Sequence, residues 1–80
     1  MNETKEFQAV LQVVVSRLTQ MIVEQMNIPG RDALSRLYSS NLYEKLEQEE
    51  TKVWHLSVPT LLSLFVEEQE TGKITFPEEA

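Results

Sequence analysis

Apolar residues recur every three or four positions along the first third of the chain, which is the period of an α-helix. The pattern predicts a helix over residues 4–26, because this stretch contains neither Gly nor Pro. Its apolar stripe is centred on Phe7, Leu11, Val14, Leu18, Ile22 and Met26 and is widened by Val10, Val13, Val15 and Met21. At about 100° per residue the stripe covers roughly 220°, about twice the arc of an ordinary surface helix. Such a helix is either the centre of its own domain or one half of an interface.

Two short helices are expected after this long one. Pro29 and Gly30 break the first helix, and a connection this short usually turns the next helix back antiparallel to the last. The apolar face then shifts across the polar triplet Ser39–Asn41, so we expect one short helix on each side of it. Asn41 and Glu44 have the spacing of a capping box at the start of the second.

The last helix is predicted after Ser57. Pro59 suits a first-turn position and disfavours helical geometry at Val58, so the cap is either Ser57 or Val58. Gly72 fits the left-handed residue that commonly follows the end of a helix. The sequence therefore predicts both ends of this helix.

Residues 52–56 and 74–76 mix polar with β-favouring residues, and they could pair as a small ribbon. Together the elements predict an all-α fold, a small bundle of three to four helices with a long N-terminal helix and a minor two-stranded ribbon. We expect a single domain over residues 1–80, in which residues 73–80 form an extended tail.

Length and composition restrict the class of protein. A chain of 80 residues buries only about 60–65% of its unfolded surface, and small domains often gain stability by associating. The absence of cysteine excludes disulfides and thiolate metal sites. Glu3 and Glu6 stand where a secretory signal needs basic residues, and the apolar run 13–15 is far shorter than the ~20 residues a bilayer requires. We therefore expect a cytoplasmic protein.

The net charge of −6 is unevenly distributed. Residues 1–40 hold four acidic and four basic side chains, whereas residues 41–80 hold nine acidic side chains against three lysines. An acidic half repels phosphate backbones and anionic membranes. The charge favours a protein partner, argues against a membrane partner and makes nucleic acid an unfavourable one.

Candidate catalytic chemistry is sparse. His55 is the one histidine, and it lacks the neighbouring groups that a nucleophilic or general-base site requires. The acidic groups 47–50 and 67–70 lack the loop ligands of a calcium site, so we interpret them as solvated faces. The sequence predicts no catalytic, cofactor-binding or metal-binding residue, no cofactor and no enzymatic activity.

A helix-turn-helix-like DNA-binding regulator is the alternative. Pro29 and Gly30 lead into a helix carrying Arg31 and Arg36, and a second short helix follows. That second stretch, residues 39–50, holds four acidic side chains and one lysine, which opposes the phosphate contacts that dominate DNA affinity.

Our main hypothesis is a non-enzymatic protein-interaction or regulatory module that forms a homodimer through the helix over residues 4–26. The aromatic residues either belong to the core or mark a contact surface, where Tyr and Trp are enriched. The hypothetical interface residues are Val10, Val13, Val14, Leu18, Met21, Tyr38, Tyr43 and Trp54.

The stretch from Asp32 to Gly72 carries an Ala-Leu helix start, then Tyr-Ser-Ser with Leu-Tyr, Glu-Thr-Lys with Trp, Ser with Leu-Leu, and a closing Glu-Glu before Gly. This pattern resembles a family of short bacterial helical proteins of unknown function, sometimes encoded beside ADP-ribosyltransferase-like toxins. The resemblance covers about half of the chain and brings no catalytic residue with it. It implies a bacterial cytosolic protein that acts on or with another protein. The partners we expect are a second copy of the chain, from the apolar arc of residues 4–26, and a genetically linked protein, from the resemblance.

Overall fold

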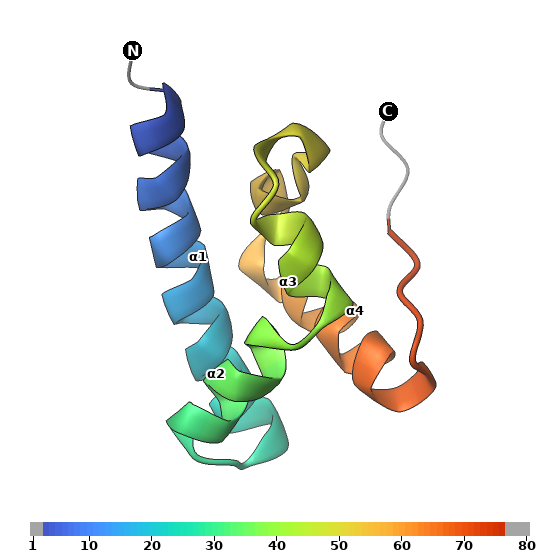
Figure 1. Cartoon of the computed structure of the whole chain (residues 1–80). Helices are drawn as coiled ribbons and strands as arrows, with labels where there is room; N and C mark the ends of the chain where they lie inside the picture. Colours follow the sequence, from blue (N-terminus) through green and yellow to red (C-terminus); the bar gives the residue numbers. More distant parts are fainter. Residues whose placement is uncertain (1–2, 77–80) are drawn as a thin grey trace.

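The computed structural model describes residues 3–76 of the chain, and the side chains of residues 6–76. The described part is an all-α bundle built around one long helix, as the sequence predicts (Figure 1). Its elements are α1 (Glu3–Met26), α2 (Gly30–Tyr38), α3 (Asn41–Leu46), the short 3₁₀ helices η1 (Glu49–Thr51) and η2 (Val53–His55), and α4 (Val58–Thr71). Helix α1 is about 36 Å long at 1.5 Å per residue, and it therefore runs nearly the full 40 Å length of the molecule.

The break after α1 lies where the sequence places it. Asn27 adopts a left-handed conformation with φ of 56°, and its N–H donates to the Val23 carbonyl oxygen at 2.8 Å. Asn tolerates this conformation better than most residues because its short polar side chain bonds locally. Pro29 is extended and precedes the first residue of α2, so the chain reverses within a few residues.

Two short helices follow, as predicted, but the cap between them is Ser40 rather than Asn41. The Ser40 hydroxyl accepts from the Tyr43 N–H at 3.0 Å and donates to the Leu37 carbonyl oxygen at 2.6 Å. One buried side chain thus ends α2 and begins α3. The expected capping box at Asn41 is wrong, since Asn41 is already the first residue of α3.

The predicted two-stranded ribbon is also wrong for the described residues. Lys52 has φ of 58°, a left-handed conformation that turns the chain instead of extending it, and residues 53–55 form η2. Trp54 closes the turn, because its indole N–H donates to the Glu49 carbonyl oxygen at 2.9 Å. Residues 73–76 contain no strand and follow α4 without regular secondary structure, while residues 77–80 of the predicted tail lie outside the described residues.

Helix α4 begins and ends as predicted. Ser57 is the N-cap, and its hydroxyl accepts from the Thr60 N–H at 3.3 Å, with Pro59 in the first turn. Gly72 ends the helix with φ of 80°, and its N–H donates to the Glu68 carbonyl oxygen at 2.7 Å. These signals involve residues within one turn of each helix end, which is why the sequence predicts them.

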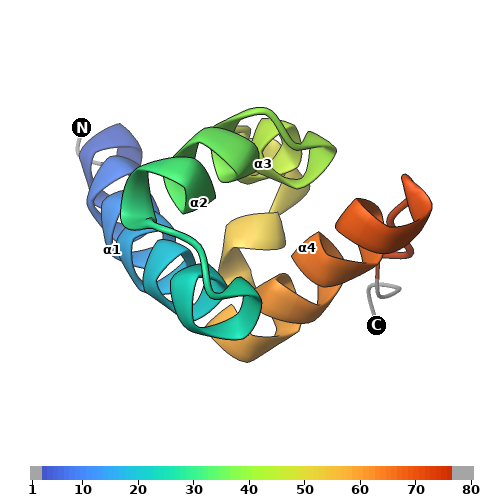
Figure 2. The same cartoon turned by 90° about the horizontal axis from the view of Figure 1, so that it is seen from below.

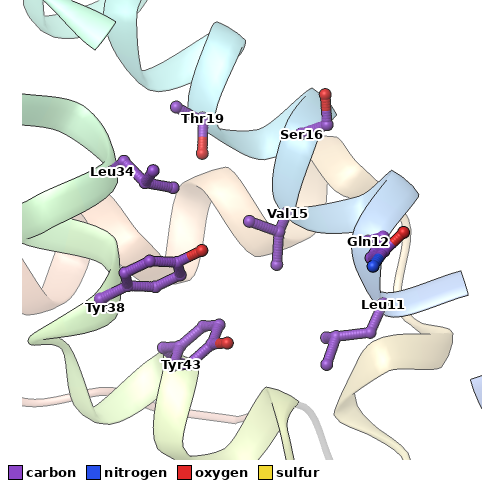
Figure 3. Close-up of a pocket in the computed structure, with 8 residues that line it drawn as sticks. All are labelled: Leu11, Gln12, Val15, Ser16, Thr19, Leu34, Tyr38 and Tyr43. Carbon is purple, nitrogen blue, oxygen red and sulfur yellow. The ribbon is translucent and has the colours of Figure 1, made fainter. Parts of the chain in front are cut away.

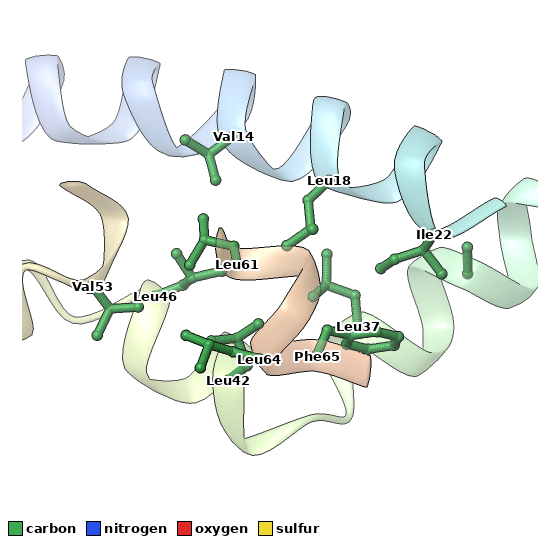
Figure 4. Close-up of a cluster of buried hydrophobic side chains, with 11 residues drawn as sticks. Val14, Leu18, Ile22, Leu37, Leu42, Leu46, Val53, Leu61, Leu64 and Phe65 are labelled. Carbon is green, nitrogen blue, oxygen red and sulfur yellow. The ribbon is translucent and has the colours of Figure 1, made fainter. Parts of the chain in front are cut away.

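The hydrophobic core lies between α1, the α2–α3 pair and α4, which surround it on three sides (Figure 2). Leu18 and Ile22 of α1 point into it, toward side chains of α2 and α4 (Figure 4). The fully buried large side chains are Phe65, Leu18, Ile22, Leu37, Leu42, Leu46 and Leu61. Burying each of them stabilises the fold by about 1.5–3 kcal/mol. None of the helices in residues 3–76 has the length and hydropathy needed to cross a bilayer.

Candidate interaction surfaces

The eight hypothetical interface residues lie in three environments. Val14 and Leu18 belong to the chain's own core, where Leu18 has no exposed surface. Met21, Tyr43 and Trp54 are half-buried. The residues that remain exposed are Val10 at 40%, Val13 at 53% and Tyr38 at 52%. The excess apolar arc of α1 is therefore only partly covered by the rest of the described chain.

Val10 and Val13 form one exposed apolar area on α1, which lies along one edge of the molecule (Figure 1). Glu6 and Arg17 are exposed one helical turn before and one turn after the two valines. We call these four residues, Glu6, Val10, Val13 and Arg17, the α1 strip. A strip of two valines between opposite charges is a small apolar centre with a polar rim, the composition typical of a contact surface.

The α1 strip continues into a shallow hollow of about 360 Å³ between α1 and the start of α4. Met21 lies here, half-buried beside Val58 and Pro59. The hollow is lined by Arg17, Gln20, Met21, Glu24, Val58 and Pro59. Arg17 belongs to both the strip and the hollow, so the two features form one continuous face.

A second surface lies on the opposite flank of α1, where an open groove of about 530 Å³ separates it from α2 and α3 (Figure 3). Val15 and Leu11 face Tyr38 and Tyr43 across this groove. Its lining residues are Leu11, Gln12, Val15, Ser16, Thr19, Leu34, Tyr38 and Tyr43. The two tyrosines are among the predicted interface residues, whereas Leu11, Val15 and Leu34 are not. Leu11 and Val15 belong to the same apolar stripe as Val10 and Val13, so periodicity does not show which of them line a groove.

The two tyrosines of the groove contact each other although they come from different helices. Their ring centroids are 4.8 Å apart with an interplanar angle of 56°. Burial raises the pKa of the Tyr43 phenol above its ordinary value, and the nearby Tyr38 and Glu47 raise it further. Tyr43 therefore stays neutral at physiological pH and offers a hydroxyl donor beside an apolar wall.

Trp54 holds η2 against the N-terminal half of α1. Its ring packs edge-on against Phe7, which is buried, with the centroids 5.2 Å apart. His55 is exposed, and its ring lies 4.1 Å from that of Trp54. These contacts account for Trp54 as part of the folded structure, and they place His55 on the surface beside it.

The acidic residues at the end of α4 hold other segments in place, so the interpretation of residues 67–70 as a solvated face is wrong for two of them. The Glu68 carboxylate accepts from the Asn41 N–H at 2.8 Å and the Leu42 N–H at 3.3 Å. The Glu67 carboxylate accepts from the N–H of Thr75 at 3.2 Å and from its hydroxyl at 3.0 Å.

No group of His, Asp and Glu side chains with the arrangement of a metal site occurs in the described part of the chain.

The charge distribution of the α2–α3 pair is unfavourable for binding DNA. In a helix-turn-helix the N-terminal residues of the second helix contact the bases. Here the first N–H groups of α3 are already bonded to the carboxylate of Glu68, which places a negative charge at that position. Glu44 and Glu47 lie exposed on and just after the same helix. The start of α3 therefore carries negative charge, which is unfavourable for contact with a phosphate backbone.

Comparison with known proteins identifies no relative: no protein family, no curated protein and no solved structure matches the chain. The resemblance of residues 32–72 to the toxin-linked bacterial family therefore stays a prediction.

Proposed function

We propose that this protein is a non-enzymatic interaction module that acts as a homodimer through α1. The observation that carries the proposal is the exposure of Val10 and Val13 on a face of α1 that the rest of the described chain leaves uncovered. Removing apolar surface from water stabilises association by about 25 cal/mol per Å² before the entropic costs of binding. Two exposed valines on each copy make a small interface, which suits a reversible regulatory contact.

Sedimentation equilibrium of the full chain tests this proposal between about 10 μM and about 1 mM, the range in which weak dimers form. We expect the apparent mass to rise with concentration from the monomer value of 9.3 kDa. A mass that stays at the monomer value over the whole range overturns the homodimer.

Two matched variants separate the two flanks of α1. Val13→Glu places a charge in the α1 strip, whereas Ser16→Glu places the same charge on the groove side. Both positions are exposed, so both variants should keep the helical circular dichroism spectrum of the wild type. We expect Val13→Glu alone to abolish the dimer, and the reverse outcome would assign the dimer to the groove.

A further inference from the structure

The charged and apolar residues of the α1 strip have the spacing of a two-helix contact. Glu6, Val10, Val13 and Arg17 are separated by four, three and four residues, which is the spacing of the a and d positions in a coiled coil. At about 100° per residue they fall within about 60° of one another around the helix. All four side chains are exposed, so this seam is a second face of α1, distinct from the face that packs in the core.

The order of the four residues is self-complementary when the helix pairs with an antiparallel copy of itself. With the twofold axis between residues 11 and 12, Val10 of one copy lies opposite Val13 of the other, and Glu6 lies opposite Arg17. The symmetry repeats each pair, so the contact has four valines at its centre and an ion pair at each end. A parallel arrangement would instead place Glu6 against Glu6 and Arg17 against Arg17, and such like-charge pairs are destabilising.

We infer that the partner of the α1 strip is a second copy of this chain in antiparallel orientation, with Glu6 paired to Arg17 across the interface. This inference rests on the proposed homodimer and specifies its geometry. The overlap ends where Gln20 of one copy faces the first residue of α1, Glu3, in the other. Glu24 lies on the same side of α1, beyond the part that faces residues 3–20 of the second copy.

Charge reversal tests the pairing in the full-length protein. In the antiparallel dimer, Glu6→Arg and Arg17→Glu each convert two ion pairs into two repulsions. We expect each single variant to weaken the dimer about tenfold or more at low salt and less at high salt. The double variant restores the ion pairs with exchanged sides, so it should return the dissociation constant to within about threefold of the wild type.

Matched controls separate this effect from a change in net charge. Glu24→Arg makes the same change in charge as Glu6→Arg but lies outside the overlap. Arg36→Glu makes the same change as Arg17→Glu, at an exposed position on α2. Both controls should leave the dissociation constant within about twofold of the wild type. If the protein dimerises but the single reversals behave like their controls, the antiparallel pairing is wrong while the homodimer stands. A monomer at every concentration overturns both.

A distance measurement gives an independent answer, since the chain contains no cysteine and accepts a single spin label at Glu24→Cys. In the antiparallel register the two labelled positions are separated by about 37 Å along the helix axes, against about 10 Å in a parallel pair. Dipolar spectroscopy of the dimer resolves this difference. A distribution centred near the shorter value overturns the inference.

Discussion

Replacing Glu68 with alanine tests the contact that joins α4 to the start of α3. The carboxylate accepts two backbone N–H groups of α3, at 2.8 and 3.3 Å, and it lies at the positive end of that helix dipole. Loss of a side chain that caps a helix costs about 0.5–2 kcal/mol, and the dipole contributes about 0.3–1 kcal/mol more. Because Glu68 is half-buried and partly screened, we expect Glu68→Ala to lower the free energy of unfolding by about 1–2 kcal/mol.

Urea unfolding followed by far-UV circular dichroism measures this loss, with all variants at one protein concentration because a dimer makes stability concentration-dependent. Glu70→Ala is the matched control, since Glu70 is exposed on the same helix and should change stability by less than about 0.5 kcal/mol. Glu68→Gln keeps one acceptor oxygen but loses the charge, so it should lie between the two. A Glu68→Ala variant as stable as the Glu70→Ala control would refute the capping role.

Three further outcomes follow from the packing. An ordinary tyrosine ionises near pH 10, and Tyr43 should ionise at a higher pH because its pKa is raised in the folded state. The neutral Tyr43 phenol therefore contributes its full stability to the fold below about pH 10, and this contribution is lost as the pH rises through the folded pKa. A spectroscopic titration of the wild type against Tyr43→Phe would show the difference. Leu61→Ala removes a fully buried core side chain and should cost about 2–5 kcal/mol, whereas Ser63→Ala on the exposed face of α4 should be nearly neutral by the same unfolding assay. Trp54→Phe keeps an aromatic ring against Phe7 but removes the hydrogen bond to the Glu49 carbonyl oxygen. We expect it to lower the free energy of unfolding by about 1 kcal/mol. An unchanged unfolding midpoint would contradict a contribution from this hydrogen bond.

Local signals in the sequence predicted much of the fold. The extent of α1 follows from its unbroken periodicity, and both ends of α4 follow from Ser57, Pro59 and Gly72. Each of these features depends on residues within one or two turns of each other. The sequence therefore contains enough information to place them without knowledge of the tertiary structure.

The errors arose where distant residues or fine backbone geometry decide the outcome. Residues 52–56 have β-favouring side chains, but the left-handed conformation of Lys52 and the bond from Trp54 to Glu49 produce a turn. The cap of α3 includes Glu68, which is 27 residues away from Asn41, so no local pattern reveals it. Periodicity showed that α1 has more apolar surface than one face needs, but only the packing shows that Leu18 is covered and Val13 is not.

The dependence of α3 on Glu68 has a consequence for the order in which a newly made chain acquires structure. A helix of six residues is far below the ~12–15 residues that an isolated helix needs in water. The ribosome delivers α1, α2 and α3 before α4, so the carboxylate that completes α3 emerges last. Until then the nascent protein holds an unfinished third helix with an uncovered side, the state in which a chaperone or a protease would meet it.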